Sequence, residues 1–307
     1  MKVIYLGTPE FAVLPLKAIA SSDRHQVVAV VTQPDRAVGR KNVITPPPIK
    51  VVANELNIPV YQYEKIRVQG VEDLKSLGAD IMITCAYGQI LSREIIDICK
   101  YGIINIHGSL LPKYRGAAPI QYAVINGEKT TGITFMQTEE GLDTGDILEV
   151  FETPIGETET ANELFERLSV LASEKVCSVL DKIEDGKITK TKQDDGKATV
   201  VKTIKKEDGI IDFNKNSETV KNLINGMNPW PIAYTFFGGK KLKFYRAKAV
   251  DGKGKAGEVV TADKRLVVAC GEGAVEIFSL QEEGGKAMDA KAYLNGRKLK
   301  VGDLLGE

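Results

Sequence analysis

The feature that most constrains the fold is an alternation, through the first half of the chain, of short apolar runs with longer segments of helical periodicity. Short apolar runs between turn residues are typical of buried strands, and the periodic segments of amphipathic helices. Strands that alternate with helices predict a doubly wound, largely parallel sheet. The expected strands are Val3–Leu6, Val27–Thr32, Pro59–Tyr61, Ile81–Cys85, Ile103–Ile106, Ile133–Gln137 and Ile147–Thr153; the expected helices are Phe11–Ser21, Ile49–Leu56, Val71–Leu77, Arg93–Cys99, Ile120–Asn126 and Ala161–Ile183.

The second half has a different pattern. With 307 residues, the chain is long enough for two domains. A polar, Lys-rich stretch predicts a linker over 186–206, between a domain at 1–185 and another at 207–307. Short β-type runs separated by Gly-Gly and Asp-Lys turns predict a small β-barrel there. Its expected strands are Gly209–Phe213, Tyr234–Phe237, Lys241–Ala247, Gly257–Thr261, Leu266–Ala269 and Ala274–Leu280, with one helix at Ser217–Asn225.

The zero net charge hides an asymmetry. Residues 1–185 hold 18 Lys and Arg against 25 Asp and Glu, whereas residues 186–307 hold 23 against 16. A basic second half is typical of a domain with a polyanionic partner. Lysines that keep a β-domain soluble and protect its edge strands would give the same composition, and composition alone favours that reading.

Cysteine spacing and hydropathy indicate a cytoplasmic protein. The four cysteines, Cys85, Cys99, Cys177 and Cys270, form no C-x-x-C pair, so we expect buried thiols in a reducing compartment rather than disulfides or a zinc site. The N-terminal apolar run is too short for a signal peptide, and no later run approaches a membrane span.

The residues with the clearest chemical meaning end the fifth expected strand. Asn105 and His107 lie two residues apart, so they share one face of that strand. A Gly-rich turn supplies Asp143. An amide that holds a carbonyl oxygen, an imidazole that handles a proton and a carboxylate that orients or charges the imidazole would form an acyl-transfer site. None of the three is an obvious nucleophile, so the nucleophile should belong to a substrate.

Two loops need separate interpretation. Residues 7–11 lack the glycine pattern of a phosphate loop, and Thr8 before Pro9 predicts a helix N-cap instead. Residues 33–48 form a loop of about 16 residues that carries Arg36, Arg40 and Lys41. A basic lid that orders on an anionic partner and a solvated loop are equally compatible with that pattern.

Several stretches together resemble the 10-formyltetrahydrofolate-dependent formyltransferases, and the resemblance runs the length of the chain. Within that family it favours the enzymes that formylate methionyl-tRNA. The stretches are Gly-Thr-Pro-Glu-Phe-Ala at 7–12, Gln-Pro-Asp-Arg at 33–36, Ala-Tyr-Gly-Gln-Ile-Leu at 86–91, Asn-Ile-His-Gly-Ser-Leu-Leu-Pro at 105–112, Arg-Gly-Ala-Ala-Pro-Ile-Gln at 115–121, Gly-Leu-Asp-Thr-Gly-Asp-Ile-Leu at 141–148 and Asn-Pro-Trp-Pro at 228–231.

The resemblance implies a Rossmann-like N-terminal domain and an OB-like C-terminal β-barrel that binds tRNA. It implies an enzyme that takes the formyl group of 10-formyltetrahydrofolate, with no metal, and transfers it to the α-amino group of initiator methionyl-tRNA. No membrane and no obligate protein partner are implied. By position, Asn105, His107 and Asp143 become catalytic. Folate contacts fall on Ser109, Leu110, Leu111, Pro112, Gln89, Ile90 and Leu91, and tRNA contacts on Arg36, Arg40, Lys41, Lys205 and Lys206.

Other functions remain compatible with the same residues. The trio is shared by formyltransferases that act on sugar nucleotides and by hydrolases that release formate from 10-formyltetrahydrofolate. A UDP-amino-sugar acceptor would not need a basic β-domain. A non-catalytic protein that binds tRNA or folate could also retain the fold, although an intact trio argues against it.

Overall fold

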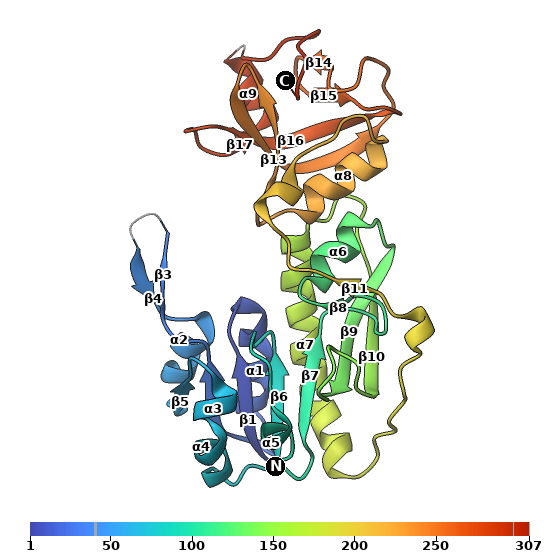
Figure 1. Ribbon diagram of the computed structural model, residues 1–307. Coiled ribbons are helices and arrows are strands. Elements are labelled where there is room, and N and C mark those ends of the chain that lie inside the picture. The colour runs from blue at the N-terminus through green and yellow to red at the C-terminus, as the bar shows by residue number, and fades with distance from the viewer. Residues whose placement is uncertain (40–41, 297, 307) are drawn as a thin grey trace. The chain divides into compact units, whose positions relative to one another are not determined.

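A computed structural model describes residues 1–39, 42–296 and 298–306 (Figure 1). The chain divides into two compact units that interleave along the sequence. The first unit comprises residues 1–116, 132–152 and 165–200, and the second comprises 117–131, 153–164 and 201–307. Residues 186–200, which were expected to belong to a linker, therefore lie within the first unit.

A seven-stranded sheet forms the centre of the first unit, in the order β10-β9-β7-β6-β1-β2-β5. Its strands β5, β2, β1, β6 and β7 are parallel, and β9 runs antiparallel to β7. The prediction of a doubly wound, largely parallel sheet is thus confirmed. The strands are β1 (Lys2–Gly7), β2 (Gln26–Thr32), β5 (Val60–Gln62), β6 (Ile81–Cys85), β7 (Ile103–His107), β9 (Thr130–Gln137) and β10 (Ile147–Pro154).

Helices pack against this sheet, so its central strands are buried on both faces. Every residue of β6 is buried, as is every residue of β1 after Lys2. One buried cluster joins side chains of the central strands to α3, α4 and α5. The helical segments are η1 (Glu10–Ala12), α1 (Val13–Ala20), α2 (Pro48–Glu55), α3 (Ile66–Gln69), α4 (Val71–Ser76), α5 (Arg93–Ile96) and α7 (Ala161–Glu184).

The start of α7 has a capping box. The Thr160 N–H donates to the Glu163 carboxylate at 2.9 Å, and the Glu163 N–H donates to the Thr160 hydroxyl at 3.3 Å. These two bonds satisfy backbone donors that have no partner within the helix.

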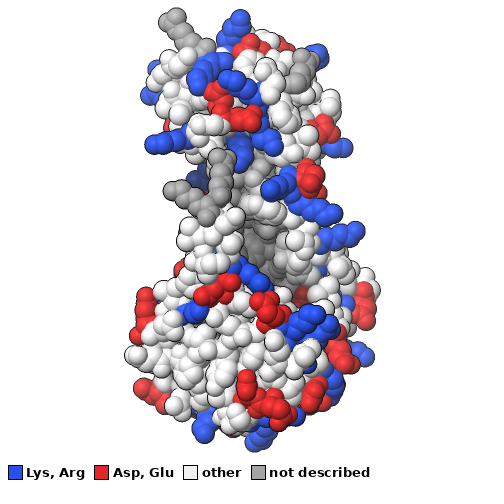
Figure 2. All heavy atoms as spheres, turned by 60° about the vertical axis from the view of Figure 1, so that its left-hand side comes forward, with Lys and Arg blue, Asp and Glu red and all other residues white. Residues whose placement is uncertain are grey.

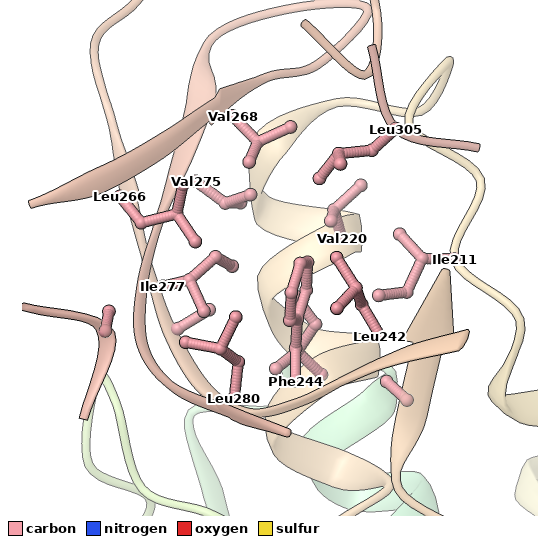
Figure 3. Close-up of a cluster of buried hydrophobic side chains, with 14 of the residues drawn as sticks. Ile211, Val220, Leu242, Phe244, Leu266, Val268, Val275, Ile277, Leu280 and Leu305 are labelled. Carbon is pink, nitrogen blue, oxygen red and sulfur yellow. The ribbon is translucent and has the colours of Figure 1, made fainter. Parts of the chain in front are cut away.

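The second unit is built on an antiparallel sheet in the order β12-β13-β16-β15-β14, with β17 paired to β16. Leu242, Phe244, Val268 and Ile277 are among the side chains that its strands and α8 enclose in one apolar core (Figure 3). Its elements are α6 (Pro119–Ile125), η3 (Lys206–Gly209), α8 (Ser217–Gly226), β12 (Ala233–Phe237), β13 (Lys240–Val250), β14 (Val259–Ala262), β15 (Leu266–Ala269), β16 (Ala274–Glu282), β17 (Met288–Asp289) and α9 (Ala290–Asn295).

Some local predictions were wrong. The strand expected over Gly209–Phe213 does not form: the chain makes the 3₁₀ turn η3, and Ile210 has only an isolated bridge to Tyr234. Ile211 and Phe213 are apolar because they fill the core rather than because they line a strand. Thr8 does not cap a helix, since its hydroxyl donates to the Tyr87 carbonyl at 2.9 Å.

Several short elements were not anticipated. A hairpin of β3 (Arg36–Val38) and β4 (Val43–Thr45) stands within the loop at 33–48. Two-residue strands β8 (Arg115–Gly116) and β11 (Val200–Val201) pair with one another, and η2 (Asp195–Lys197) precedes β11. Such elements are too short to show a hydrophobic period. Within the described ranges, no helix has the length and apolar character needed to cross a membrane.

Candidate active site

Asn105 and His107 lie at the carboxyl end of β7, on the same face of the strand. The neighbouring parallel strand β6 aligns Thr84 with Asn105. In doubly wound sheets, ligands bind beyond the carboxyl ends of the strands. Apolar neighbours bury β7, and the His107 side chain is only 5% exposed. The sequence position of these two residues therefore places them where this fold binds substrates.

The Asn105 amide has a fixed orientation. Its Nδ2 donates to Asp143 Oδ1 at 3.3 Å, and its Oδ1 accepts a hydrogen bond from the Thr84 hydroxyl at 3.0 Å. An ionised carboxylate can only accept, so the amide nitrogen must face Asp143. The second amide hydrogen has no acceptor among the described residues. Asn105 can thus donate that hydrogen to a substrate oxygen.

The His107 imidazole is held by a backbone carbonyl. Its Nε2 lies 2.9 Å from the Tyr114 oxygen, and a carbonyl only accepts, so Nε2 carries a hydrogen. Its Nδ1 lies 3.7 Å from Asp143 Oδ2, beyond hydrogen-bond distance. Nδ1 is therefore the nitrogen that can gain or release a proton, and the ring donates from Nδ1 only when it is positively charged.

Asp143 completes the trio from a tight turn. Its backbone has a positive φ of 52°, a conformation that Asp tolerates better than most residues. The Gly116 N–H donates to Asp143 Oδ2 at 2.9 Å, so the carboxylate accepts bonds from two donors, of which one is Asn105. Nearby, a Cβ at Gly145 would lie 1.8 Å from the Gln137 carbonyl, which explains the glycine there. The three residues singled out as catalytic are thus brought together.

The residues that orient the trio were not found from sequence. The register of two strands places the Thr84 hydroxyl beside Asn105. Tyr114 and Gly116 bind His107 and Asp143 with backbone atoms. A register cannot be read from one strand alone. Backbone contacts leave no side-chain pattern, although Gly116, with a φ of 112°, fits the preference of that conformation for glycine.

The predicted folate contacts after β7 lie in a tightly bonded turn. The Ser109 side chain is buried, and its hydroxyl donates to the Lys113 carbonyl at 2.7 Å. The Thr134 hydroxyl donates to the Ser109 carbonyl, and the Leu111 N–H donates to the Thr134 oxygen. The Leu111–Pro112 peptide is cis. In this arrangement Ser109 shapes the turn, and Leu110 is partly exposed.

The second group of predicted folate contacts follows β6. The Gln89 amide donates to the Tyr63 carbonyl at 2.8 Å and to Gln33 Oε1 at 3.3 Å, and it accepts from the Ile66 N–H. Its polar atoms therefore hold the loop. Ile90, at 76% exposure, presents an apolar surface at this edge of the sheet, and Leu91 is half-buried.

The predicted tRNA contacts belong to both units. Arg36 lies on β3 and pairs with the exposed Glu64 at 2.6 Å. Arg40 and Lys41 lie outside the described residues. Lys205 and Lys206 are exposed at the start of η3.

Elsewhere in the first unit, His25, Asp181 and Glu184 bring three potential metal-ligand atoms within 4.8 Å of one another. The Arg24 guanidinium already pairs with both carboxylates, at 3.1 Å and 2.9 Å. The carboxylates are thus neutralised by protein, and this group is structural.

Comparison with known proteins identifies the relatives of this chain. The family model described as formyl transferase matches residues 1–180, and the model described as formyl transferase, C-terminal domain, matches residues 203–298. A methionyl-tRNA formyltransferase of Geotalea uraniireducens is 46% identical over 310 residues, which cover 100% of this chain and 98% of that protein. A methionyl-tRNA formyltransferase of Lachnospira eligens is 44% identical, with 100% of both chains covered.

A solved structure has the same fold. The N-formyltransferase of Helicobacter canadensis, in complex with folinic acid and dTDP-3-aminofucose, superposes with a TM-score of 0.70. The match covers 90% of this chain and 98% of that chain at 19% identity. At this identity the likeness concerns the fold alone.

Proposed function

The chain belongs to the formyl transferase family, and from this membership we propose that it transfers the formyl group of 10-formyltetrahydrofolate to the α-amino group of methionyl initiator tRNA. The product, N-formylmethionyl-tRNA, serves translation initiation. The two relatives described above are methionyl-tRNA formyltransferases, and the matches cover 98% and 100% of their lengths. This similarity supports methionyl-tRNA as the acceptor. Catalysis belongs to residues 1–185, and tRNA binding chiefly to 207–307.

The observation that carries the chemistry is the convergence of Asn105, His107 and Asp143 without a free nucleophile among them. Among the described residues, the one hydroxyl bonded to the trio belongs to Thr84 and donates to Asn105. The nucleophile is then the acceptor amine. It attacks the formyl carbon, the bond from that carbon to N10 breaks, and one proton moves from the amine to N10.

Asn105 and His107 stabilise the negative charge that develops on the formyl oxygen. Asn105 donates its second amide hydrogen, and a donor of this kind contributes about 2.7–4 kcal/mol of transition-state stabilisation. A His107 N–H can donate to the same oxygen, and because Nε2 is bonded to the Tyr114 carbonyl, the donor would be Nδ1 of the protonated ring. The Asp143 carboxylate, 3.7 Å from Nδ1, stabilises the charged ring and assists transfer of the amine proton.

Binding of the donor rests on the two turns at the carboxyl ends of β6 and β7. Residues 109–112 and 89–91 flank the strand ends that carry Thr84 and Asn105, and the exposed Ile90 offers apolar contact for a flat ring. The polar side-chain atoms of Gln89 and Ser109 are bonded within the protein. These turns would therefore contact a folate-derived donor through apolar side chains and backbone groups.

Binding of tRNA rests on basic side chains in both units. Lys and Arg side chains spread over much of the visible surface, alongside Asp and Glu (Figure 2). The excess of basic residues in 186–307 favours a polyanion there. Lys205 and Lys206 are exposed, as phosphate contacts must be. Arg36, Arg40 and Lys41 complete the proposed tRNA contacts.

Formylation assays with 10-formyltetrahydrofolate test this function. We expect rapid formylation of methionyl initiator tRNA, slow formylation of methionyl elongator tRNA, and none of a nucleotide-linked amino sugar. Transfer to the amino sugar but not to either tRNA would contradict this proposal and show that the acceptor is a nucleotide-linked amino sugar. Release of formate without transfer would make the protein a hydrolase, and tight tRNA binding without any turnover would make it a binding protein.

A further inference from the structure

Gln193 is a buried polar residue in a stretch whose neighbours are exposed. Lys192 and Asp194 on either side are exposed, whereas Gln193 is 7% exposed. Burial of an amide is unfavourable unless its hydrogen bonds are satisfied. The question is therefore what the Gln193 amide holds.

The Gln193 amide binds the turn that carries Asp143. Its Nε2 donates to the Asp143 carbonyl at 2.9 Å and to the Gly145 carbonyl at 2.7 Å. Its Oε1 accepts from the Arg115 guanidinium, from Nε at 3.0 Å and from Nη2 at 2.9 Å. Carbonyls only accept and a guanidinium only donates, so the amide has one orientation and all four bonds are used.

The same support reaches the Asp143 carboxylate from the other side. Arg115 is 6% exposed, and its own N–H donates to the Thr199 carbonyl at 2.8 Å. The next residue, Gly116, donates its N–H to Asp143 Oδ2 at 2.9 Å. Gln193 and Arg115 thus couple the backbone of Asp143 to the strand that binds its side chain.

We propose that Gln193 is a positioning residue for formyl transfer: it fixes the backbone of Asp143 so that the carboxylate stays beside Asn105 and His107. This inference rests on the proposed function. The Asp143 backbone has the left-handed conformation, which most residues leave unless the surroundings hold them there. The turn belongs to no helix or strand, so no regular backbone hydrogen bonds hold it. The two hydrogen bonds from Gln193 stabilise its backbone instead.

Loss of these bonds should lower kcat more than it raises KM. A displacement of about 1 Å at a reacting group can cost about 10²-fold in rate. For Gln193→Met, which keeps the volume and removes the hydrogen bonds, we expect kcat to fall about 10–100-fold with KM for 10-formyltetrahydrofolate nearly unchanged. Gln193→Glu should fold, because its carboxylate still accepts from Arg115. It should show a similar loss of kcat, because a carboxylate cannot donate to the two carbonyls and is repelled by them.

Gln137 offers a matched control. Its Nε2 also donates to two backbone carbonyls, those of Tyr101 and Ile103, at 3.4 Å and 3.1 Å. It pairs with Ile104 at the beginning of β7, whereas His107 pairs with Thr134 at the end. Gln137→Met should therefore lower thermal stability, by less than Gln193→Met because its hydrogen bonds are longer, and leave kcat near that of the wild type.

A double-mutant cycle separates positioning from a general loss of structure. If Gln193 acts through Asp143, Gln193→Met should lower kcat by less than about threefold in an Asp143→Asn background, because effects of residues that act as one unit are not additive. An unchanged kcat in either folded Gln193 variant, or an equal loss in both backgrounds, would overturn the proposal. The acceptor of the wild-type enzyme is settled separately, since the cycle compares variants with whichever acceptor the wild type formylates.

Discussion

Replacement of the Asp143 carboxylate by an amide tests the electrostatic part of the mechanism. Asp143 accepts from Gly116 at 2.9 Å and from Asn105 at 3.3 Å. An Asn side chain has the same shape but only one acceptor oxygen, so its NH₂ group must face one of these donors. One of the two bonds is then lost, and the orientation of the Asn105 amide loses support.

The larger effect comes from the charge. Asp143 Oδ2 lies 3.7 Å from His107 Nδ1, and two unit charges at this separation attract by about 4–5 kcal/mol at an effective dielectric constant of about 20. Since 1.36 kcal/mol corresponds to a factor of ten, the ceiling is about 10³-fold. The ring is only partly charged in the transition state, so we expect Asp143→Asn to lower kcat by about 10²–10³-fold.

Single-turnover formylation between about pH 6 and 9, the range over which His and the α-amino group titrate, would measure this. Binding of folate and tRNA should hardly change, while the rate falls and the pH–rate profile changes shape. Asp146 in the same turn is a suitable control, because its side chain makes no hydrogen bond among the described residues. An Asp143→Asn enzyme with full kcat and the wild-type profile would show that Asp143 is only a turn residue.

Three further predictions concern other residues. Asn105→Ala should lower kcat by about 10²–10³-fold with folate affinity by calorimetry unchanged, because its bond strengthens as charge develops. Burial raises the pKa of Cys85 and Cys270 to about 12 and that of Cys99 to about 11, so these thiols should resist alkylation at about pH 8 until urea unfolds the protein. Burial lowers the pKa of His25, so this residue binds a proton more readily in the unfolded state than in the folded state. The free energy of unfolding should therefore fall as the pH drops below about 6.5. In His25→Gln this fall should be smaller.

The central sheet was predictable because its signal is local. Buried parallel strands are continuous apolar runs, and the run at Ile81–Cys85 matches the observed strand β6 end to end. Asn105 and His107 followed from the same logic, since a period of two puts them on one face and a strand end puts them at the ligand edge. Where apolar residues fill a core without forming a strand, as at Ile211 and Phe213, the same reasoning failed.

The environment of Asp143 could not be predicted in this way. It meets Asn105 across 38 positions of sequence, through a turn whose shape depends on a positive φ. Gln193 lies in a stretch rich in Lys, Asp and Gly, and that composition is typical of a solvated linker. One buried amide does not change the average composition of such a stretch. Only the folded chain shows that Gln193 binds the turn of Asp143 and that residues 186–200 belong to the first unit.

The turn at 114–116 shows how backbone geometry decides what the trio can do. Tyr114 and Gly116 both have positive φ values, 61° and 112°. The first offers its carbonyl to His107 Nε2, and the second offers its N–H to Asp143 Oδ2. The acceptor fixes the imidazole tautomer, and the donor fixes the orientation of the carboxylate. Backbone geometry therefore leaves Nδ1 as the His107 nitrogen that has no hydrogen bond among the described residues, whereas the side-chain motif specifies only which residues meet.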